Sequence, residues 1–292
     1  MTDTAARLAT LMGRDVVDAR PAAWGFTNRT TTVTLRTGER LVVHEMRDRA
    51  AVERRAHTMG ALAPRLAAAG IVVPRVIDAA PDASPPFVLT DHLDGRPGGE
   101  LLDDTTDAIA LGTEMGRLLR RLWSVPIDAL SLDVSWSDGD RLHAAVAPML
   151  AAVERELPDV AGAELRRLVD GLPAALAGRD PVLAHGDWVP VNVLVDGLVV
   201  VAVLDWDQAR LADRLLDVAW WAWVVGHHHP GAFAAAWPAF LETAGVELDP
   251  PTMRRIRGLA AARLLEAVAS APPGPERERW LRRLGGTFGA GK

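Results

Sequence analysis

The sequence contains no cysteine, and its only lysine is the last residue, Lys292. The absence of cysteine excludes disulfides and thiolate metal sites, and nothing in the sequence requires an oxidising compartment. No apolar run approaches the roughly 20 residues needed to cross a bilayer. Residues 1–13 also lack the continuous apolar stretch of a signal peptide. We therefore expect a cytoplasmic protein that has no membrane partner.

A strongly basic surface is also missing, because the formal net charge is −6. A general nucleic-acid binder neutralises phosphates with a basic face, so nucleic acid is not an expected partner. With 292 residues and 49% apolar composition, the chain can bury a sizeable core, either as one two-lobed unit or as two small domains. A monomer and a homodimer remain equally open.

The first part of the chain is predicted to form strands around one helix. Short β-rich runs lie at residues 33–35, 41–46 and 86–93. Between them, residues 49–69 carry apolar side chains at helical spacing. A turn-rich stretch then begins near residue 90, so we expect a small β-rich region with one long helix, followed by a hinge.

The rest of the chain is predicted to be mainly helical, with one short β interruption. The interruption comprises residues 182–184, 191–195 and 198–204, which are β-branched runs separated by turns. Together with the N-terminal strands this predicts an α+β fold. The expected helices are 106–123, 142–157, 165–176, 215–225, 232–244, 252–270 and 276–284.

The most informative motif is HGDWVPVN at residues 185–192, followed by LDWD at residues 204–207. Asp187 follows a strand, Asn192 comes five residues later, and Asp205 ends the next short hairpin. Carboxylate and amide oxygens suit Mg²⁺, which binds proteins through one or two carboxylates together with substrate phosphates. The Asp-x-x-x-x-Asn spacing also matches the catalytic loop of kinases. Capping and turn roles are the alternative for any one of these residues.

These motifs resemble those of the aminoglycoside phosphotransferase family, which has His-Gly-Asp-x-x-x-x-Asn followed by (Ile/Leu)-Asp-Trp-(Glu/Asp). The segment ADRLLDVA at residues 212–219 is similar to the family's Gly-Asp-Pro-x-x-Asp-(Leu/Val)-Ala, with two departures. GFTNRT at residues 25–30 resembles the turn over the ATP phosphates, and residues 87–93 resemble the strand before the adenine-binding hinge. The resemblance covers about residues 20–270.

The resemblance implies a protein-kinase-like two-lobed fold, with a nucleotide-binding lobe at residues 1–95 and a catalytic and acceptor-binding lobe at residues 96–292. The implied activity is ATP-dependent O-phosphotransfer to a small molecule, namely an antibiotic such as an aminoglycoside or macrolide, a sugar or an amino alcohol. ATP or GTP and Mg²⁺ are the implied cofactors.

The resemblance also implies roles for individual residues. Asp187 would orient or deprotonate the acceptor hydroxyl, and Asn192 and Asp205 would hold Mg²⁺. The residues expected to contact the acceptor are Trp188, Asp207 and Trp221. The residues expected to contact or support the nucleotide are Gly25, Thr27, Asn28, His44, Glu53, Thr90, Asp91 and Leu93.

The main departure from the family pattern is His44, which stands where the family has a strand lysine or arginine. A histidine is only partly protonated near neutrality unless a carboxylate raises its pKa, and Glu53 is the candidate carboxylate. If His44 faces solvent, Arg47 or Arg29 could supply the charge. This departure motivates one alternative, a nucleotide-binding pseudokinase. A second alternative is an enzyme that uses the same fold to transfer a nucleotidyl group.

Three further features concern structure and the acceptor. Asp217 lies at the start of a helix, and we expect it to support the catalytic loop rather than to react. Acidic residues outnumber basic ones in residues 128–180, which suits a cationic acceptor, whereas arginines outnumber acids after residue 226. The acceptor class therefore stays open. We do not interpret His227–His229 as a metal site, because adjacent histidines point in different directions.

Overall fold

The computed structural model describes residues 3–22 and 29–289. Its contacts divide the chain into two compact units. Unit 1 comprises Met1–Glu100 and Pro190–Asp207, and unit 2 comprises Leu101–Val189 and Gln208–Lys292. The segment Pro190–Asp207 lies far along the chain but packs with the N-terminal part, which the sequence did not indicate.

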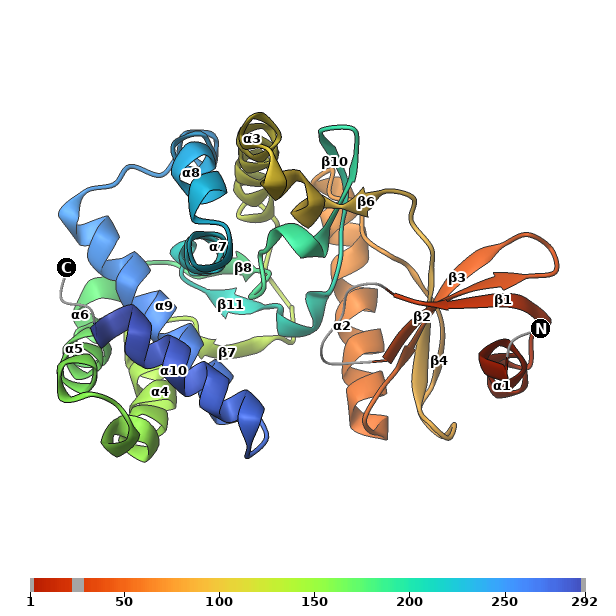
Figure 1. Ribbon diagram of the computed structural model, residues 1–292, viewed down its shortest axis with the longest axis horizontal. Coiled ribbons are helices and arrows are strands. Elements are labelled where there is room, and N and C mark those ends of the chain that lie inside the picture. The colour runs from red at the N-terminus through yellow and green to blue at the C-terminus, as the bar shows by residue number, and fades with distance from the viewer. Residues whose placement is uncertain (1–2, 23–28, 290–292) are drawn as a thin grey trace. The chain divides into compact units, whose positions relative to one another are not determined.

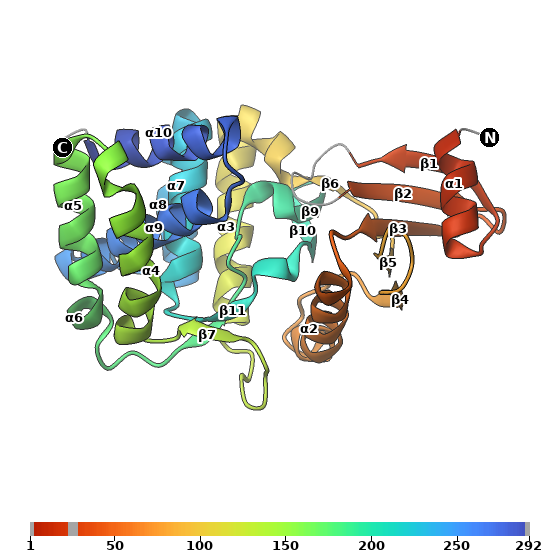
Figure 2. The same ribbon diagram turned by 90° about the horizontal axis from the view of Figure 1, so that it is seen from below.

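Unit 1 is built on a five-stranded antiparallel sheet in the order β1-β2-β3-β5-β4 (Figure 1). Side chains alternate between its two faces, so Leu89 packs with Leu8 of the first helix while Val88 packs with Val52 of the second. The two helices therefore cover opposite faces of the sheet, and Figure 2 shows α1 lying across the strands. The elements are α1 Asp3–Met12, β1 Val16–Pro21, β2 Arg29–Leu35, β3 Arg40–Glu45, α2 Arg49–Ala68, β4 Val76–Ala80 and β5 Phe87–Asp91.

A second, three-stranded sheet in unit 1 has the order β10-β9-β6. Gly95 precedes β6 with a φ of 143°, and a Cβ atom there would lie 2.9 Å from the Leu194 side chain. Only glycine allows this close approach. The sheet carries the hairpin that ends at Asp205. Its elements are β6 Arg96–Pro97, the 3₁₀ turn Pro190–Asn192, β9 Val193–Asp196 and β10 Val199–Val203.

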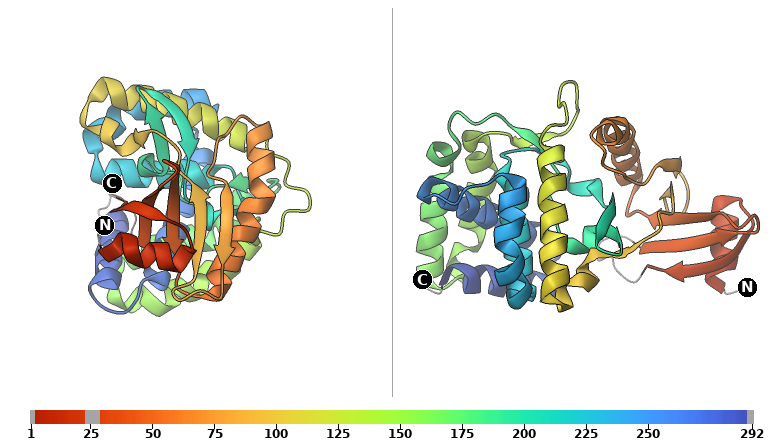
Figure 3. Two further views of the ribbon diagram at one scale, coloured as in Figure 1. Left: turned by 90° about the vertical axis from the view of Figure 1, so that its right-hand side faces the viewer. Right: turned by 90° about the horizontal axis from the view of Figure 1, so that it is seen from above.

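Unit 2 is helical except for a small sheet in the order β7-β11-β8. Helices α3 and α8 pack very closely and lie side by side in Figure 3, because Gly112 and Gly116 leave room for the α8 backbone. The strands are β7 Asp133–Trp136, β8 Val182–Ala184 and β11 Arg210–Ala212. The helices are α3 Thr105–Leu122, α4 Gly139–Val153, α5 Asp159–Asp170, α6 Leu172–Leu176, α7 Leu215–His228, α8 Pro230–Ala244, α9 Pro250–Ser270 and α10 Pro275–Gly289, and 3₁₀ turns lie at Gly98–Asp103, Glu154–Glu156 and Trp206–Gln208.

The structure confirms the α+β prediction and most of the expected elements. One correction concerns the N-terminus, where a single helix was expected in the first ninety residues but α1 adds another. Its inward residues Ala5, Leu8 and Met12 do have helical spacing, but the helix has only 10 residues, so the periodic signal is short. The strands β1 and β4 were also not expected. Among the described helices, none combines the length and the apolar character needed to span a membrane.

Candidate active site

The loop that carries Asp187 is fixed in unit 2 by the buried carboxylate of Asp217. The two oxygens of Asp217 accept hydrogen bonds from the backbone amides of His185 and Gly186, each at 2.8 Å. Burial raises the pKa of Asp217, while His185 and the two amide hydrogen bonds act in the opposite direction. A structural role that braces the catalytic loop was predicted for Asp217, and these hydrogen bonds confirm it.

Gly186 is the residue at which this loop needs an unusual backbone. Its φ is 80°, in the left-handed region, and a Cβ atom there would overlap the backbone oxygen of Gln208. A side chain at residue 186 would thus be both strained and crowded. The loop can pass this close to the segment after Asp207 only because residue 186 is glycine.

The carboxylate of Asp187 is held by a residue that the sequence did not indicate, Trp220. The indole N–H of Trp220 donates to Oδ1 of Asp187 over 2.7 Å. Arg263 stacks on the Trp220 ring, with 4.8 Å between its guanidinium carbon and the ring centroid, and donates through Nε to the backbone oxygen of Gly186 at 3.1 Å. Trp220 and Arg263 therefore support Asp187 and the residue before it.

Glu266 on α9 joins the two segments that meet at Gly186. It accepts hydrogen bonds from Arg263 at 3.0 Å and from Arg210 at 2.8 Å. Arg210 in turn donates to the backbone oxygen of Gln208 at 3.1 Å, and its own side chain is almost fully buried. One carboxylate thus pairs with two buried guanidinium groups, which would otherwise be costly to desolvate.

Asn192 and Asp205, the two predicted metal ligands, both belong to unit 1. The backbone amide of Leu204 donates to the backbone oxygen of Asn192 at 2.8 Å. Because Leu204 directly precedes Asp205, this bond holds the backbones of the two predicted ligands close together. Asp205 has a φ of 57°, which a residue other than glycine seldom adopts and which often marks a functional position. An amide and a carboxylate oxygen suit Mg²⁺. The described residues contain no cluster of three or more histidine, aspartate or glutamate side chains suited to a metal.

Arg55 on α2 supplies a positive charge beside these acidic groups, again within unit 1. Its guanidinium forms an ion pair with Asp207 at 2.8 Å and lies 3.9 Å from Asp205. Only 11% of the Arg55 side chain is exposed. Ion pairs with little solvent access are screened less than those on the surface, so Arg55 offsets much of the negative charge of this region. Asp207, expected at the acceptor, is thus paired with a residue of unit 1.

The expected pairing of His44 with Glu53 is wrong. The Glu53 carboxylate accepts a hydrogen bond from Arg49 at 2.7 Å, one helical turn away on the exposed side of α2. His44 instead lies between the hydroxyls of Thr30 and Thr90, at 3.4 and 3.3 Å. Burial, and then the charge of Arg55, lower the pKa of His44 well below its usual 6.5. The lowered pKa favours the neutral form of His44, which makes it a poor substitute for the strand lysine as a cation.

The remaining residues predicted for the nucleotide occupy the end of β5 or lie outside the described residues. Thr90 is buried beside His44, and Asp91 accepts hydrogen bonds from both the backbone amide and the side chain of Arg75. Leu93 follows in the connection to β6 and is partly buried. The predicted phosphate turn with Gly25, Thr27 and Asn28 falls outside the described residues.

Two tryptophans expected to face the acceptor are instead part of the core. Trp221 is 0% exposed and stacks on Phe240, with 4.4 Å between the ring centroids. Trp188 is 1% exposed and packs edge-on against the His185 ring at 5.7 Å. A ring without exposed surface has nothing to offer a ligand, so the predicted acceptor contacts of Trp188 and Trp221 are corrected to packing roles.

Comparison with known proteins identifies the family of this chain. A family model described as the phosphotransferase enzyme family matches residues 18–265. The chain belongs to this family. Membership confirms the predicted resemblance and the predicted class of enzyme, a small-molecule phosphotransferase with a hydroxyl acceptor. The predicted motif residues Asp187, Asn192 and Asp205 all lie within the matched range.

Solved structures of family members have the same two-lobed, kinase-like fold. The chain is similar to macrolide 2'-phosphotransferase MphH from Brachybacterium faecium, at 24% identity with a TM-score of 0.66, covering 97% of this chain and 98% of that one. It is also similar to aminoglycoside 2'-phosphotransferase-IIIa, solved as a GDP complex, at 15% identity with a TM-score of 0.76, covering 98% and 99%. The predicted fold class is therefore confirmed.

A much longer curated relative also matches part of the chain. Acyl-CoA dehydrogenase family member 10 of Mus musculus is 32% identical over 186 residues, which is 58% of this chain but 16% of the mouse protein. The phosphotransferase chain thus spans about a sixth of that relative's length.

Proposed function

We propose that this phosphotransferase moves the γ-phosphoryl group of ATP or GTP to a hydroxyl of a small molecule, with Asp187 as the catalytic residue. The observation that carries the proposal is the set of hydrogen bonds around Asp187. Trp220 orients its carboxylate, and Asp217 fixes the two amides before it. Phosphoryl transfer depends mostly on positioning and charge neutralisation, so a rigidly held carboxylate is what the reaction requires.

In this proposal the Asp187 carboxylate accepts the proton of the acceptor hydroxyl while the hydroxyl oxygen forms the new bond to phosphorus. The bond to the nucleoside diphosphate breaks, and the diphosphate leaves with the electron pair. Asn192 and Asp205 would hold Mg²⁺, which when bound neutralises charge on the nucleotide phosphates. The neighbouring oxygen donors of unit 1 support this assignment, as does the positive charge of Arg55 beside them.

The nucleotide and the acceptor are proposed from related structures together with the site. Family members have been solved with GDP and, in aminoglycoside phosphotransferase APH(4)-Ia, with ADP and hygromycin B. The candidate acceptors for this chain are aminoglycosides, macrolides, sugars and amino alcohols. Thr90, Asp91 and Leu93 would contact the nucleotide base, as predicted from the resemblance, and His44 would contribute packing or a hydrogen bond rather than charge.

The test is magnesium-dependent turnover with ATP and with GTP across a panel of these acceptors, read by product mass. We expect one phosphoryl group to be added to an acceptor by the wild-type enzyme and to none by Asp187→Asn or Asp205→Ala. Asp196→Ala, a substitution at an exposed acid at the end of β9, is the matched control and should retain activity. Full activity in Asp187→Asn would refute the assignment of the catalytic residue.

A nucleotide-binding pseudokinase is the second candidate, and a specific observation favours it. The strand position that carries a cation in the family holds His44, whose pKa is lowered well below 6.5. The same assay separates the two candidates. Nucleotide binding that requires Asp205, combined with no transfer to any acceptor, would support the pseudokinase, whereas a nucleotidyl adduct in the product mass would indicate a nucleotidyltransferase.

A further inference from the structure

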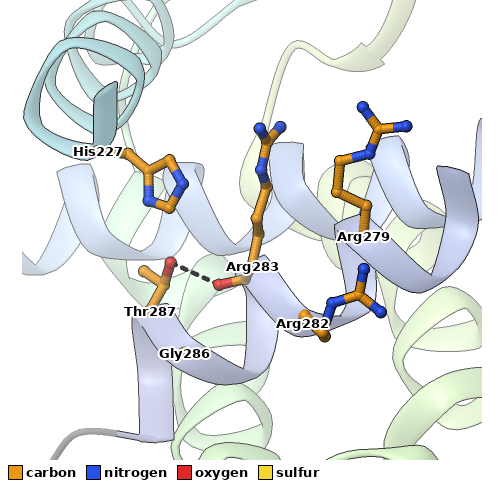
Figure 4. A pocket seen from close by; sticks show the side chains of 6 residues that line it. All are labelled: His227, Arg279, Arg282, Arg283, Gly286 and Thr287. Carbon is orange, nitrogen blue, oxygen red and sulfur yellow. Dashed lines mark hydrogen bonds between the residues drawn. The ribbon is translucent and has the colours of Figure 1, made fainter. Parts of the chain in front are cut away.

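Helix α10 and the end of α7 form a pocket of about 450 Å³ in unit 2. Figure 4 shows the side chains of Arg279 and Arg283 extending in the same direction from α10, with His227 of α7 beside Arg283. The residues that line the pocket are His227, Arg279, Arg282, Arg283, Gly286 and Thr287. None of them is acidic, so this cavity, here called the α10 pocket, has a basic lining.

The positive charge of the pocket follows from the sequence of α10. The acids of this helix, Glu276 and Glu278, lie in its first turn, and residues 279–289 contain arginines but no acid. The last turn contains no basic residue, so attraction to the helix dipole does not account for the arginines. The whole chain has a formal net charge of −6, which makes this basic cluster a local exception.

The charges of the α10 pocket are only weakly compensated by acidic groups. Among the residues that the structure describes, Arg279 and Arg283 have no carboxylate within ion-pair distance. Arg282 has only Glu278, at 3.8 Å. Arg277 of the same helix, which does not line the pocket, forms an ion pair at 2.6 Å. The guanidinium groups of Arg279 and Arg283 therefore keep their N–H donors for a ligand.

The cations of the pocket also lower one another's affinity for protons. After burial, the charge of Arg279 is the main cause that lowers the pKa of Arg283. The pKa of His227 is likewise lowered by burial and then by the charge of Arg283. Each shift means that a positive charge costs free energy beside its neighbours. A bound anion would relieve this repulsion.

Aromatic rings hold the cations of the pocket in position. The guanidinium carbon of Arg283 lies 4.9 Å from the centroid of the Trp280 ring. His227 stacks on Trp223, with 5.1 Å between the ring centroids. The Trp223 indole N–H donates to the Thr287 hydroxyl at 3.0 Å, and that hydroxyl donates to the backbone oxygen of Arg283 at 2.8 Å. These contacts use none of the guanidinium N–H donors, so the cations are oriented before any ligand binds.

We propose that the α10 pocket is an anion-binding site that takes a diphosphate group, either as inorganic pyrophosphate or as part of a larger molecule. Arg279 and Arg283 would each bind one phosphate through paired N–H groups, the geometry that a guanidinium offers to phosphate oxygens. One helical turn separates these two arginines, so adjacent phosphates of one ligand can reach both. His227 and Arg282 would add positive charge beside them. The pocket is independent of the transfer reaction, because none of its residues is among those assigned to catalysis, the metal or the acceptor.

The binding test measures the dissociation constant of inorganic pyrophosphate by calorimetry, with EDTA present so that no metal complex forms. We expect Arg279→Gln and Arg283→Gln each to weaken binding about fivefold, as for an exposed ion pair. Arg254→Gln, a substitution at an exposed arginine of α9 outside the pocket, is the matched control and should leave the affinity unchanged. Equal affinity in Arg279→Gln, Arg283→Gln and the wild type would overturn the proposal.

A further variant separates the α10 pocket from the proposed nucleotide site. Arg55 lies beside Asp205 and Asp207 in unit 1, so pyrophosphate bound where the nucleotide phosphates are proposed to lie would depend on Arg55. We expect Arg55→Gln to leave the affinity for metal-free pyrophosphate unchanged. A loss of affinity in Arg55→Gln without a loss in Arg283→Gln would place the pyrophosphate in unit 1 and refute the pocket as its site.

Two other anions identify the group that is bound. Inorganic phosphate should bind at least about fivefold more weakly than pyrophosphate, because a single phosphate pairs with only one of the two guanidinium groups. Equal affinity for phosphate and pyrophosphate would refute a diphosphate site. ADP with EDTA, measured in Arg55→Gln, distinguishes the two sources of the group. Binding of ADP as tight as that of pyrophosphate would support the diphosphate of a larger molecule, whereas weaker binding would support inorganic pyrophosphate.

Discussion

The indole N–H of Trp220 donates a hydrogen bond of 2.7 Å to the carboxylate of Asp187. The ring that makes this bond lies between Arg263 on one side and Trp223 on the other. A carboxylate with one oxygen fixed in this way keeps a defined orientation, which is an advantage when a proton must be accepted in one geometry.

Trp220→Phe keeps an aromatic ring but removes this hydrogen bond. Because a hydrogen bond to a charged group contributes about 1.5–3 kcal/mol, we expect kcat to fall at least about tenfold, with the nucleotide KM almost unchanged. Trp223→Phe is the control, since its N–H donates to Thr287 instead of Asp187. Equal losses of kcat in the two variants would contradict a specific positioning role for Trp220.

Gly186→Ala should be severely destabilising. The new methyl group would overlap the Gln208 backbone at a φ of 80°, and we expect a loss of at least about 3 kcal/mol in the free energy of unfolding. Gly178 has a similar φ of 66° with no atom within 4 Å, so Gly178→Ala should cost only about 1 kcal/mol. Urea unfolding of both variants measures the difference, and similar midpoints would contradict the crowding argument.

Arg55→Gln is expected to weaken nucleotide binding. Without Arg55, the negative charge of Asp205 and Asp207 is no longer offset and repels the phosphates, so the dissociation constant of the nucleotide should rise about tenfold. Arg49→Gln is a control on the same helix, since Arg49 pairs with Glu53 on the exposed side. Tighter nucleotide binding in Arg55→Gln would instead mean that Arg55 competes with the metal for Asp205.

The stability of the protein should depend on His44 in mildly acidic solution. The pKa of His44 is lowered in the folded state, so the unfolded chain takes up the proton first as the pH falls. The contribution of neutral, buried His44 to the free energy of unfolding is complete above about pH 6.5. This contribution is lost progressively as the pH falls towards the folded-state pKa of His44.

Between pH 7 and pH 5 the free energy of unfolding of His44→Gln should therefore fall by about 2 kcal/mol less than that of the wild type. His92, His227 and His228 also have lowered pKa values, and the difference between the two proteins removes their common contribution. Parallel curves for the two proteins would show that His44 is protonated equally in both states.

The catalytic motif could be found from the sequence because its residues are close together along the chain. Asp187, Asn192 and Asp205 have the spacing of a loop and a hairpin, and Asp217 begins the next helix, so local order made the motif recognisable, and the resemblance to the family suggested roles for its residues. Trp220 was missed for a physical reason. Helix α7 is apolar on nearly all sides, and no periodic pattern distinguishes the face of Trp220 from that of the buried Trp221.

Long-range pairs were the least predictable part of the site. Glu53 was expected to pair with His44. Glu53 instead forms an ion pair with Arg49, which lies one turn away on the same helix. Arg55 contacts Asp207, which is more than 150 residues away along the chain. Such partners follow from tertiary packing, so an arginine in a predicted helix carried no local signal of its role.

The path of the chain between its two units limits how this enzyme can be taken apart or recombined. The chain passes from one unit to the other at Glu100–Leu101, again at Val189–Pro190, and back at Asp207–Gln208. A gene fragment ending at residue 100 would leave β6 without β9, the strand it pairs with. The two units are therefore not interchangeable cassettes, and a property of either unit is more readily altered by substitution within that unit than by exchange of a continuous stretch of the chain.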